Sequence, residues 1–143
     1  REWLILELRE DYRVGDRVFG KGSVIAAKFD AFMKGERDFD VLFEPSETTA
    51  FVGLTPTKNH LVLNVLDNVK NRLTVLTYEG GEWSRKPLVG APAFGSVSVS
   101  AVDDEENDDF FMTVTDYLTP TTLMMGTIGE EPETLKQLPA FFN

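Results

Sequence analysis

The segment LVLNVLDNVKNRLTVLTYEGGEWSRKPL, residues 61–88, contains two long apolar runs and a shorter third run, separated by polar turn residues. Short runs of this kind, bounded by Asn, Asp and Gly, are typical of β-strands. Gly80-Gly81 stands between the second and third runs, where a glycine pair can adopt the positive φ angles of a tight hairpin turn. The segment therefore predicts three strands joined by short turns.

The same pattern returns in FMTVTDYLTPTTLMMGTIGEEPETLKQL, residues 111–138, and the two segments align without a gap. Few residues are identical, but two strands, a loop, a Gly-containing hairpin and a closing strand that ends in Leu88 or Leu138 coincide. The strands expected before the two segments, Thr49–Thr55 and Ser96–Val102, raise each unit to four strands. Four-stranded units that repeat at about 50 residues indicate the blades of a β-propeller.

The region before these units, Trp3–Phe43, supplies three further strands in the same order, lengthened by a hairpin around Gly15 and Gly20-Lys21-Gly22. Helical periodicity is almost absent, so we expect only about one helical turn, near Asp30–Lys34. Thr119-Pro120-Thr121 is expected to interrupt the ladder between two strands, because Pro has no N–H to donate. The expected strands are Trp3–Arg9, Arg17–Phe19, Ser23–Phe29, Phe39–Phe43, Thr49–Thr55, His60–Leu66, Arg72–Tyr78, Trp83–Leu88, Ser96–Val102, Phe110–Thr115, Thr122–Thr127 and Thr134–Leu138.

These patterns predict an all-β fold, a partial β-propeller of nearly three four-stranded antiparallel blades. The expected blades span approximately residues 1–45, 46–90 and 91–143, with no catalytic domain beside them. Because a closed ring needs about four to eight blades, we expect exposed apolar blade faces and self-association of the chain. One alternative is a self-contained β-sandwich or barrel that acts as an interaction or ligand-binding module, although it does not explain the repeat. Another is a propeller that serves as a scaffold for partner proteins.

Composition and charge exclude several classes of function. The chain has 143 residues, of which 42% are hydrophobic, enough for a single domain or part of a larger one. Its 14 Lys and Arg against 24 Asp and Glu give a net charge of -10, which would repel a nucleic-acid backbone. No apolar run approaches the roughly 18 residues that suggest a membrane span. We therefore expect neither a nucleic-acid nor a membrane partner.

The chain contains no cysteine and a single histidine, His60. The absence of cysteine excludes disulfides, thiolate metal sites and a cysteine nucleophile, and it favours a reducing compartment, so we expect a cytoplasmic location. One histidine cannot form a His-based metal cluster. No signal peptide is visible, and because the chain starts at Arg1 without Met and ends on Phe141-Phe142-Asn143, we expect a piece of a longer protein.

Several stretches resemble a known family. LDNVKNRLTVLTYEGGEWSRKPL (residues 66–88), FGSVSVSAVDDEENDDFFMTVTDYLTPTTL (residues 94–123) and LKQLPAFFN (residues 135–143) are similar to the propeller domain of the prolyl oligopeptidase family of serine peptidases. The similarity is strongest at TDYLTPTTL, residues 115–123, which resembles the last blades before the chain returns to the hydrolase domain. GSVIAAKFDAFMKGERDFDVLFEP, residues 22–45, is similar to a bacterial subgroup, and the resemblance covers essentially the whole chain.

The resemblance implies a parent enzyme that cleaves short peptides after proline, with a serine–aspartate–histidine triad on an α/β-hydrolase domain and a propeller that restricts which peptides reach it. No G-x-S-x-G nucleophile elbow occurs in the 143 residues, so we expect this part to be inert as a peptidase. We assign it no catalytic, cofactor-binding or metal-binding residue and no cofactor. The partners implied are short peptide substrates, a hydrolase domain and further blades.

Three groups of residues are candidate sites. His60 begins a strand, and we expect a structural role because no nucleophile or orienting carboxylate is recognisable near it. The acidic run from Asp103 to Asp109 could supply oxygen ligands to calcium, but it lacks EF-hand spacing, so we expect a solvated loop between two strands. A basic group is expected to form a solvated face, with a tunnel-lining or domain-contacting role as the alternative: Lys70, Arg72, Arg85 and Lys86.

Aromatic residues are numerous, and a ligand-binding cluster is the alternative to core packing. Adjacent sheets must fill the space between them with large side chains, so we expect packing between blades. The residues concerned are Phe29, Phe32, Phe39, Phe43, Phe110, Phe111, Phe141 and Phe142. Trp83 follows the glycine pair and is expected to pack across a blade face.

Overall fold

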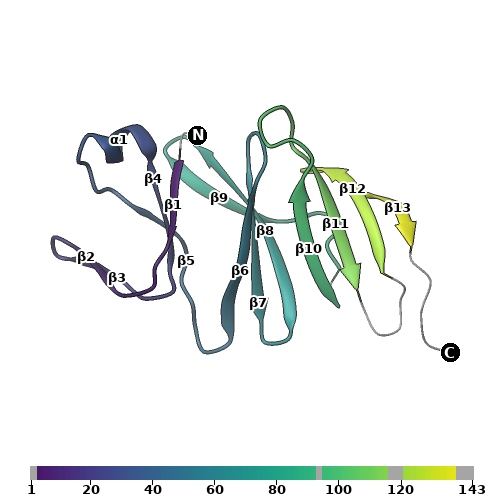
Figure 1. The fold of residues 1–143 in the computed structure, drawn as a ribbon, viewed down its shortest axis with the longest axis horizontal. Coiled ribbons are helices and arrows are strands. Elements are labelled where there is room, and N and C mark those ends of the chain that lie inside the picture. The colour runs from purple at the N-terminus through teal and green to yellow at the C-terminus, as the bar shows by residue number, and fades with distance from the viewer. Residues whose placement is uncertain (1–2, 93–94, 116–120, 138–143) are drawn as a thin grey trace. The chain divides into compact units, whose positions relative to one another are not determined.

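The computed structural model describes residues 3–92, 95–115 and 121–137, and apart from one short helix its regular secondary structure is antiparallel β-sheet (Figure 1). The chain divides into two compact units, Arg1–Phe51 and Val52–Asn143. Among the described residues, no helix has the length and apolar character needed to cross a membrane.

The first unit contains a three-stranded sheet in the order β1 (Trp3–Glu7), β4 (Val24–Lys28), β5 (Asp40–Phe43). Between β1 and β4 the chain forms a hairpin of β2 (Tyr12–Val14) and β3 (Arg17–Phe19), whose tight turn holds Gly15 at φ +60°. The short helix α1 (Phe29–Met33) follows β4. The first unit therefore consists of three sheet strands and an inserted hairpin, as predicted from the positions of Gly15 and Gly20-Lys21-Gly22.

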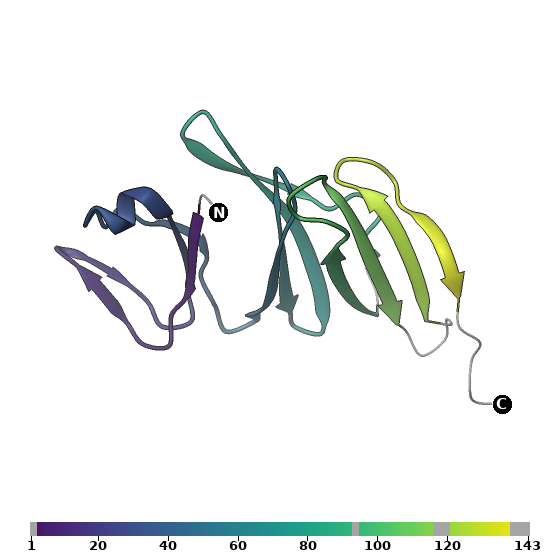
Figure 2. The same cartoon turned by 45° about the horizontal axis from the view of Figure 1, so that its top comes forward.

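The second unit contains two four-stranded meanders, each of which follows the chain order (Figure 2). The first sheet consists of β6 (Thr49–Pro56), β7 (Leu61–Asp67), β8 (Lys70–Glu79) and β9 (Glu82–Pro87). The second consists of β10 (Ser96–Ala101), β11 (Asp109–Thr115), β12 (Thr122–Thr127) and β13 (Glu133–Gln137). Strand β6 begins two residues before the end of the first unit and continues into the second.

The core of the second unit lies between its two sheets. Alternate residues of the central strands face inward, so that Val62 and Val75 of the first sheet join Phe110 and Met112 of the second in one apolar cluster. Phe110 and Met112 are completely inaccessible to solvent. At about 25 cal/mol per Å² of apolar surface, burying a side chain such as Phe110 contributes on the order of 2–3 kcal/mol.

The internal repeat predicted from the sequence is confirmed as two sheets of four strands each. Tyr78 pairs with Trp83 across the two-residue turn Gly80-Gly81, in which both glycines have positive φ (+61° and +85°), as a type I′ hairpin requires. The corresponding hairpin from β12 to β13 is longer and carries a register shift at Leu123/Met124. The sheets are open, so the described residues do not form a closed barrel, which was one alternative to the propeller.

Most predicted strands differ from the observed ones by one or two residues at an end. The exception is β2, which was not predicted because its three residues are too short to show an alternating pattern. The helical turn predicted at Asp30–Lys34 is α1, one residue earlier. The interruption predicted at Pro120 and the final residue of the last strand, Leu138, lie outside the described residues.

Candidate functional site

A cluster of polar residues surrounds Asp108, at the end of the loop between β10 and β11. Its Oδ1 accepts hydrogen bonds from the Thr57 hydroxyl and the Asn59 backbone N–H, both at 2.7 Å. Its Oδ2 accepts a third from the Asn59 side-chain amide, also at 2.7 Å. Thr57 and Asn59 belong to the turn between β6 and β7, so the Asp108 carboxylate joins one sheet to the other.

These hydrogen bonds determine the ionisation of Asp108. Its side chain is only 17% exposed, and this burial by itself would raise the pKa. The bonds from the Asn59 backbone, the Thr57 hydroxyl and the Asn59 amide, with a smaller contribution from His60, outweigh burial and hold the pKa of Asp108 below its ordinary value of 3.8. Asp108 is therefore a carboxylate at neutral pH, because all its partners stabilise the charged form.

His60 lies at the edge of the same cluster. Its Nδ1 is 2.7 Å from the Thr77 hydroxyl of β8, and its Nε2 is 4.0 Å from Asp108 Oδ2. Neither neighbour is recognisable near His60 in the sequence, because pairing of β7 with β8 brings in Thr77 and packing of the two sheets brings in Asp108, which lie 17 and 48 positions away.

The hydroxyl–imidazole–carboxylate row does not make a hydrolytic centre, however. Asp108 points both its oxygens at Thr57 and Asn59 rather than orienting the imidazole at hydrogen-bond distance. Neither of the two pockets described below is lined by these residues. The cluster is a joint between two sheets, and the structural role predicted for His60 fits this position.

A second joint connects the sheets through side-chain amides. The Asn64 amide of β7 donates to the Val97 carbonyl at 3.0 Å, and the Val97 N–H donates to Asn71 Oδ1 at 3.1 Å. The Asn71 amide donates to Asn64 Oδ1 at 2.9 Å, which closes the network. Two residues further along β10, the Thr55 hydroxyl donates to the Val99 carbonyl at 3.1 Å. Side chains thus satisfy backbone groups on the open edge of β10, which would otherwise be free to pair with another strand.

The acidic run is a loop between two strands, as predicted, but its residues are not all solvated. Asp103 Oδ1 accepts hydrogen bonds from the backbone N–H groups of Glu105 and Glu106, which shapes the turn. Asp109 accepts a hydrogen bond from the Thr127 hydroxyl of β12. Over the described part of the chain, no three His, Cys, Asp or Glu side chains come together in an arrangement suited to a metal ion.

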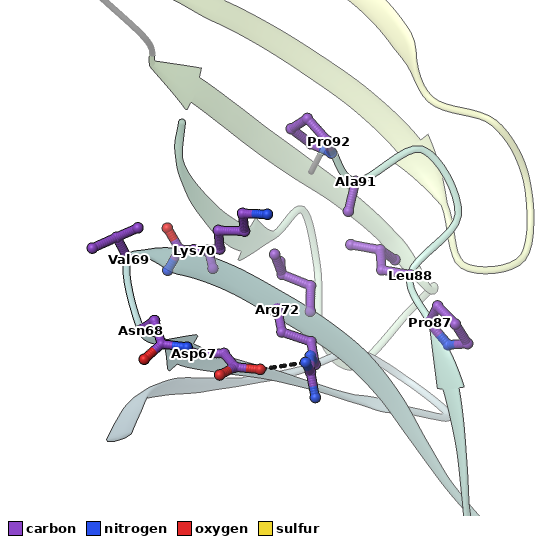
Figure 3. A pocket seen from close by; sticks show the side chains of 11 residues that line it. Asp67, Asn68, Val69, Lys70, Arg72, Pro87, Leu88, Ala91 and Pro92 are labelled. Carbon is purple, nitrogen blue, oxygen red and sulfur yellow. Dashed lines mark hydrogen bonds and ion pairs between the residues drawn. The ribbon is translucent and has the colours of Figure 1, made fainter. Parts of the chain in front are cut away.

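A pocket of the second unit opens beside the turn between β7 and β8 (Figure 3). Its volume is about 440 Å³, and its apolar floor includes the buried residues Leu73 and Leu88. Arg72 forms an ion pair with Asp67 across it, and Val69 at the turn is 87% exposed. The lining residues are Asp67, Asn68, Val69, Lys70, Asn71, Arg72, Leu73, Pro87, Leu88, Ala91 and Pro92.

This pocket offers binding surface rather than catalytic groups. Its described lining residues include two cations and one carboxylate, but no histidine and no serine, threonine or cysteine to act as a nucleophile. Of the basic residues singled out in the sequence, Lys70 and Arg72 line the pocket, whereas Arg85 and Lys86 lie on β9 and do not. In the first unit a smaller pocket of about 360 Å³ is lined by Lys28, Asp30, Ala31, Lys34 and Glu36, with two charges of each sign.

The aromatic residues serve mainly as core. In the first unit, Tyr12, Phe19 and Phe39 pack with ring centroids 5.7–6.4 Å apart, and Phe32 of α1 lies 6.2 Å from Phe39. The expectation was wrong for Phe29, which is 42% exposed because α1 turns Phe32 rather than Phe29 toward this cluster. Phe141 and Phe142 lie outside the described residues. In the second unit, Trp83 packs edge-on against Tyr78 at 5.3 Å.

The residues that matter most to the joints were not recognised in the sequence. Asn64, the one polar residue within the apolar run Leu61–Leu66, is 8% exposed. A buried amide in such a run needs hydrogen-bond partners, and that was the available signal. Thr57 and Asn59 carried no such signal, because their partner lies 49 to 51 residues away.

Comparisons with known proteins agree on one fold. The sequence model of the family described as "Prolyl oligopeptidase, N-terminal beta-propeller domain" matches residues 13–136. An uncharacterized peptidase of Rickettsia prowazekii (strain Madrid E) is 24% identical over 141 residues, which cover 96% of this chain and 19% of the relative. An uncharacterized peptidase of Sinorhizobium fredii (strain NBRC 101917 / NGR234) is 32% identical over 129 residues, which cover 88% of this chain and 18% of the relative.

Among solved structures, that of a post-proline cleaving enzyme from Rickettsia typhi matches with a TM-score of 0.83 and 22% identity. The match covers 99% of this chain and 21% of the enzyme. The chain therefore spans about a fifth of the length of each of these proteins.

Proposed function

Because the chain belongs to the prolyl oligopeptidase N-terminal β-propeller family, we propose that it forms part of a serine-type peptidase that cleaves short peptides after proline. In that protein, this part is a non-catalytic wall that restricts which peptides reach the active site. The observation that carries the proposal is the family match over residues 13–136, to which the two open four-stranded sheets correspond in architecture.

The division of labour follows from what the chain itself contains. It has no nucleophile elbow, and its only histidine is held in the joint between the sheets. Its chemistry is therefore limited to binding and exclusion. We further propose that residues 1–45, 46–90 and 91–143 are three consecutive blade units, the first of them with three sheet strands.

In isolation, we expect this chain to pair with a second copy of itself. On the second sheet, the residues that alternate with the core residues point to the opposite face, where Phe111 pairs in register with Met125 and Thr113 with Leu123. These side chains are only partly buried, and in the intact protein we propose that a further blade covers them.

The proposal is tested with the intact protein that carries this chain. We expect it to hydrolyse a short chromogenic prolyl peptide, to lose that activity on treatment with a serine-directed reagent, and to leave a long unfolded polypeptide with the same cleavage site intact. The 143-residue chain alone should hydrolyse neither substrate. Activity on the short peptide that resists the serine reagent would overturn the serine-type assignment, and equal cleavage of both substrates would overturn the filter.

A further inference from the structure

The boundary between the two sheets of the second unit is held by two different joints. One is the Asp108 carboxylate with its three hydrogen bonds of 2.7 Å to Thr57 and Asn59. The other consists of the amides of Asn64 and Asn71 on the backbone of Val97. Both end on β10 or on the loop that follows it, so they close the same side of the boundary between the sheets.

The Asp108 joint is the stronger of the two, because hydrogen bonds to an ionised acceptor are shorter and about twice as strong as neutral ones. It is reinforced by a backbone bond in the same place, from the Lys58 N–H to the Asn107 carbonyl at 3.0 Å. Thr57 is only 5% exposed, so without Asp108 its hydroxyl would keep only the longer hydrogen bond of 3.3 Å to the His60 carbonyl. Loss of this one side chain would therefore leave the Lys58–Asn107 backbone bond to hold the turn between β6 and β7 to the loop before β11, and so weaken that attachment.

The two joints lie on the side of the boundary formed by β6 and β10, and this side bears on the access of peptides to a central channel. The opposite edge strands, β9 and β13, carry mostly exposed residues with charged side chains, as solvent-facing edges do. In a propeller the blades surround a central channel, and we assign β6 and β10, the first strand of each sheet, to the channel side. A gap between β6 and β10 would then widen the channel.

We propose that Asp108 is a positioning residue for substrate selection: by locking the turn between β6 and β7 to the loop before β11, it keeps the boundary between these sheets closed to long polypeptides. This inference rests on the proposed function, since a filter that excludes long polypeptides needs a rigid boundary between the sheets, and Asp108 would supply part of that rigidity. Asp108 touches no substrate and acts through Thr57 and Asn59.

The test compares Asp108→Asn with wild type in the intact protein, on a short prolyl peptide and on a long unfolded polypeptide with the same site. An asparagine removes the negative charge from the acceptor, and its NH₂ group stands where Asp108 Oδ2 accepts from Asn59, so the Asn59 amide would have to turn its Oδ1 toward it. We expect kcat/KM on the short peptide to stay unchanged and the long-to-short ratio of kcat/KM to rise about tenfold, the change that follows from losing one charge-assisted hydrogen bond.

Two further variants serve as control and confirmation. Glu105→Gln removes the same charge from an exposed position in the same loop and should change neither rate. Thr57→Val removes one donor without changing side-chain volume, and we expect it to raise the same ratio by a smaller factor. If Asp108→Asn fails to fold, the comparison of Thr57→Val with wild type decides the matter.

A structural readout separates local opening from general damage. Hydrogen exchange in the intact protein should show faster exchange of the Lys58 amide in Asp108→Asn, while the Val97 amide, held by Asn71, stays protected. Faster exchange at Lys58 with an unchanged long-to-short ratio would overturn the inference but leave the proposed function intact. A wild-type protein that does not cleave the short peptide would overturn the proposed function itself.

Discussion

At the scale of single residues, Asp108 makes stability depend on pH in a defined direction. Its pKa in the folded chain is below 3.8, so the unfolded chain binds the proton more readily. The ionised carboxylate therefore stabilises the fold above about pH 4, and this contribution is lost as the pH falls from there through the lowered pKa.

We predict that Asp108→Asn lowers the free energy of unfolding of the chain by about 2 kcal/mol at pH 7, because bonds to a charged acceptor are lost. The difference from wild type should shrink as the pH is lowered below about 4, where wild-type Asp108 also loses its charge. Urea unfolding at several pH values measures this, with Glu105→Gln as the control. A difference that is constant from pH 7 to pH 3 would contradict the assigned ionisation.

Asn68 is the one non-glycine residue with positive φ (+58°) in the described ranges, and it occupies the first position of the two-residue turn between Asp67 and Lys70. Only this first position has positive φ, as in a type II′ turn, which favours glycine there. We predict that Asn68→Ala lowers the free energy of unfolding by about 1 kcal/mol, whereas Asn68→Gly does not lower it. Val69→Ala, at the exposed neighbouring position, is the control and should stay within about 0.5 kcal/mol of wild type.

At the scale of elements, the connection from β9 to β10 passes so close to the loop between β12 and β13 that only glycine fits. A Cβ on Gly90 would lie 2.3 Å from Pro132 Cδ, and the φ of Gly90 is +83°. Gly129 has a similar φ of +93° but open space around it.

We predict that Gly90→Ala costs at least about 3 kcal/mol of stability, since crowding adds to backbone strain, whereas Gly129→Ala costs only the strain, about 1–2 kcal/mol. Thermal unfolding of the two variants measures the difference. Equal losses of stability in the two variants would show that Pro132 does not crowd a side chain at position 90.

The elements themselves were largely predictable, because each strand of the second unit lies in a short apolar or alternating run bounded by turn residues. The turn at Gly80-Gly81 was predictable for the same local reason. The joints were not, because Asp108 meets Thr57 only when two sheets pack, and nothing near either residue in sequence records that contact. Of the pocket at Arg72, only the basic residues were noticed in the sequence. The pocket itself could not be predicted, because Leu88 in its lining comes from the connection after β9.

At the scale of the whole molecule, the uncovered face of the second sheet should control association of the isolated chain. We predict that Phe111→Lys shifts the chain from self-associated species toward monomer, because a charge on this partly buried face opposes its burial against a second copy. Light scattering at several concentrations measures the mass. Val69→Lys, at an exposed turn, is the control, and an equal shift in both variants would place the contact elsewhere.

Each of the two units contains one tryptophan. The chain has two, Trp3 on β1 in the first unit and Trp83 beside Tyr78 in the second. Replacing either one by Phe leaves a single fluorophore whose emission reports on one unit alone. Superimposable denaturation curves from the two single-tryptophan proteins would mean that the units fold as one cooperative body, whereas separate midpoints would show that each is a foldon in its own right.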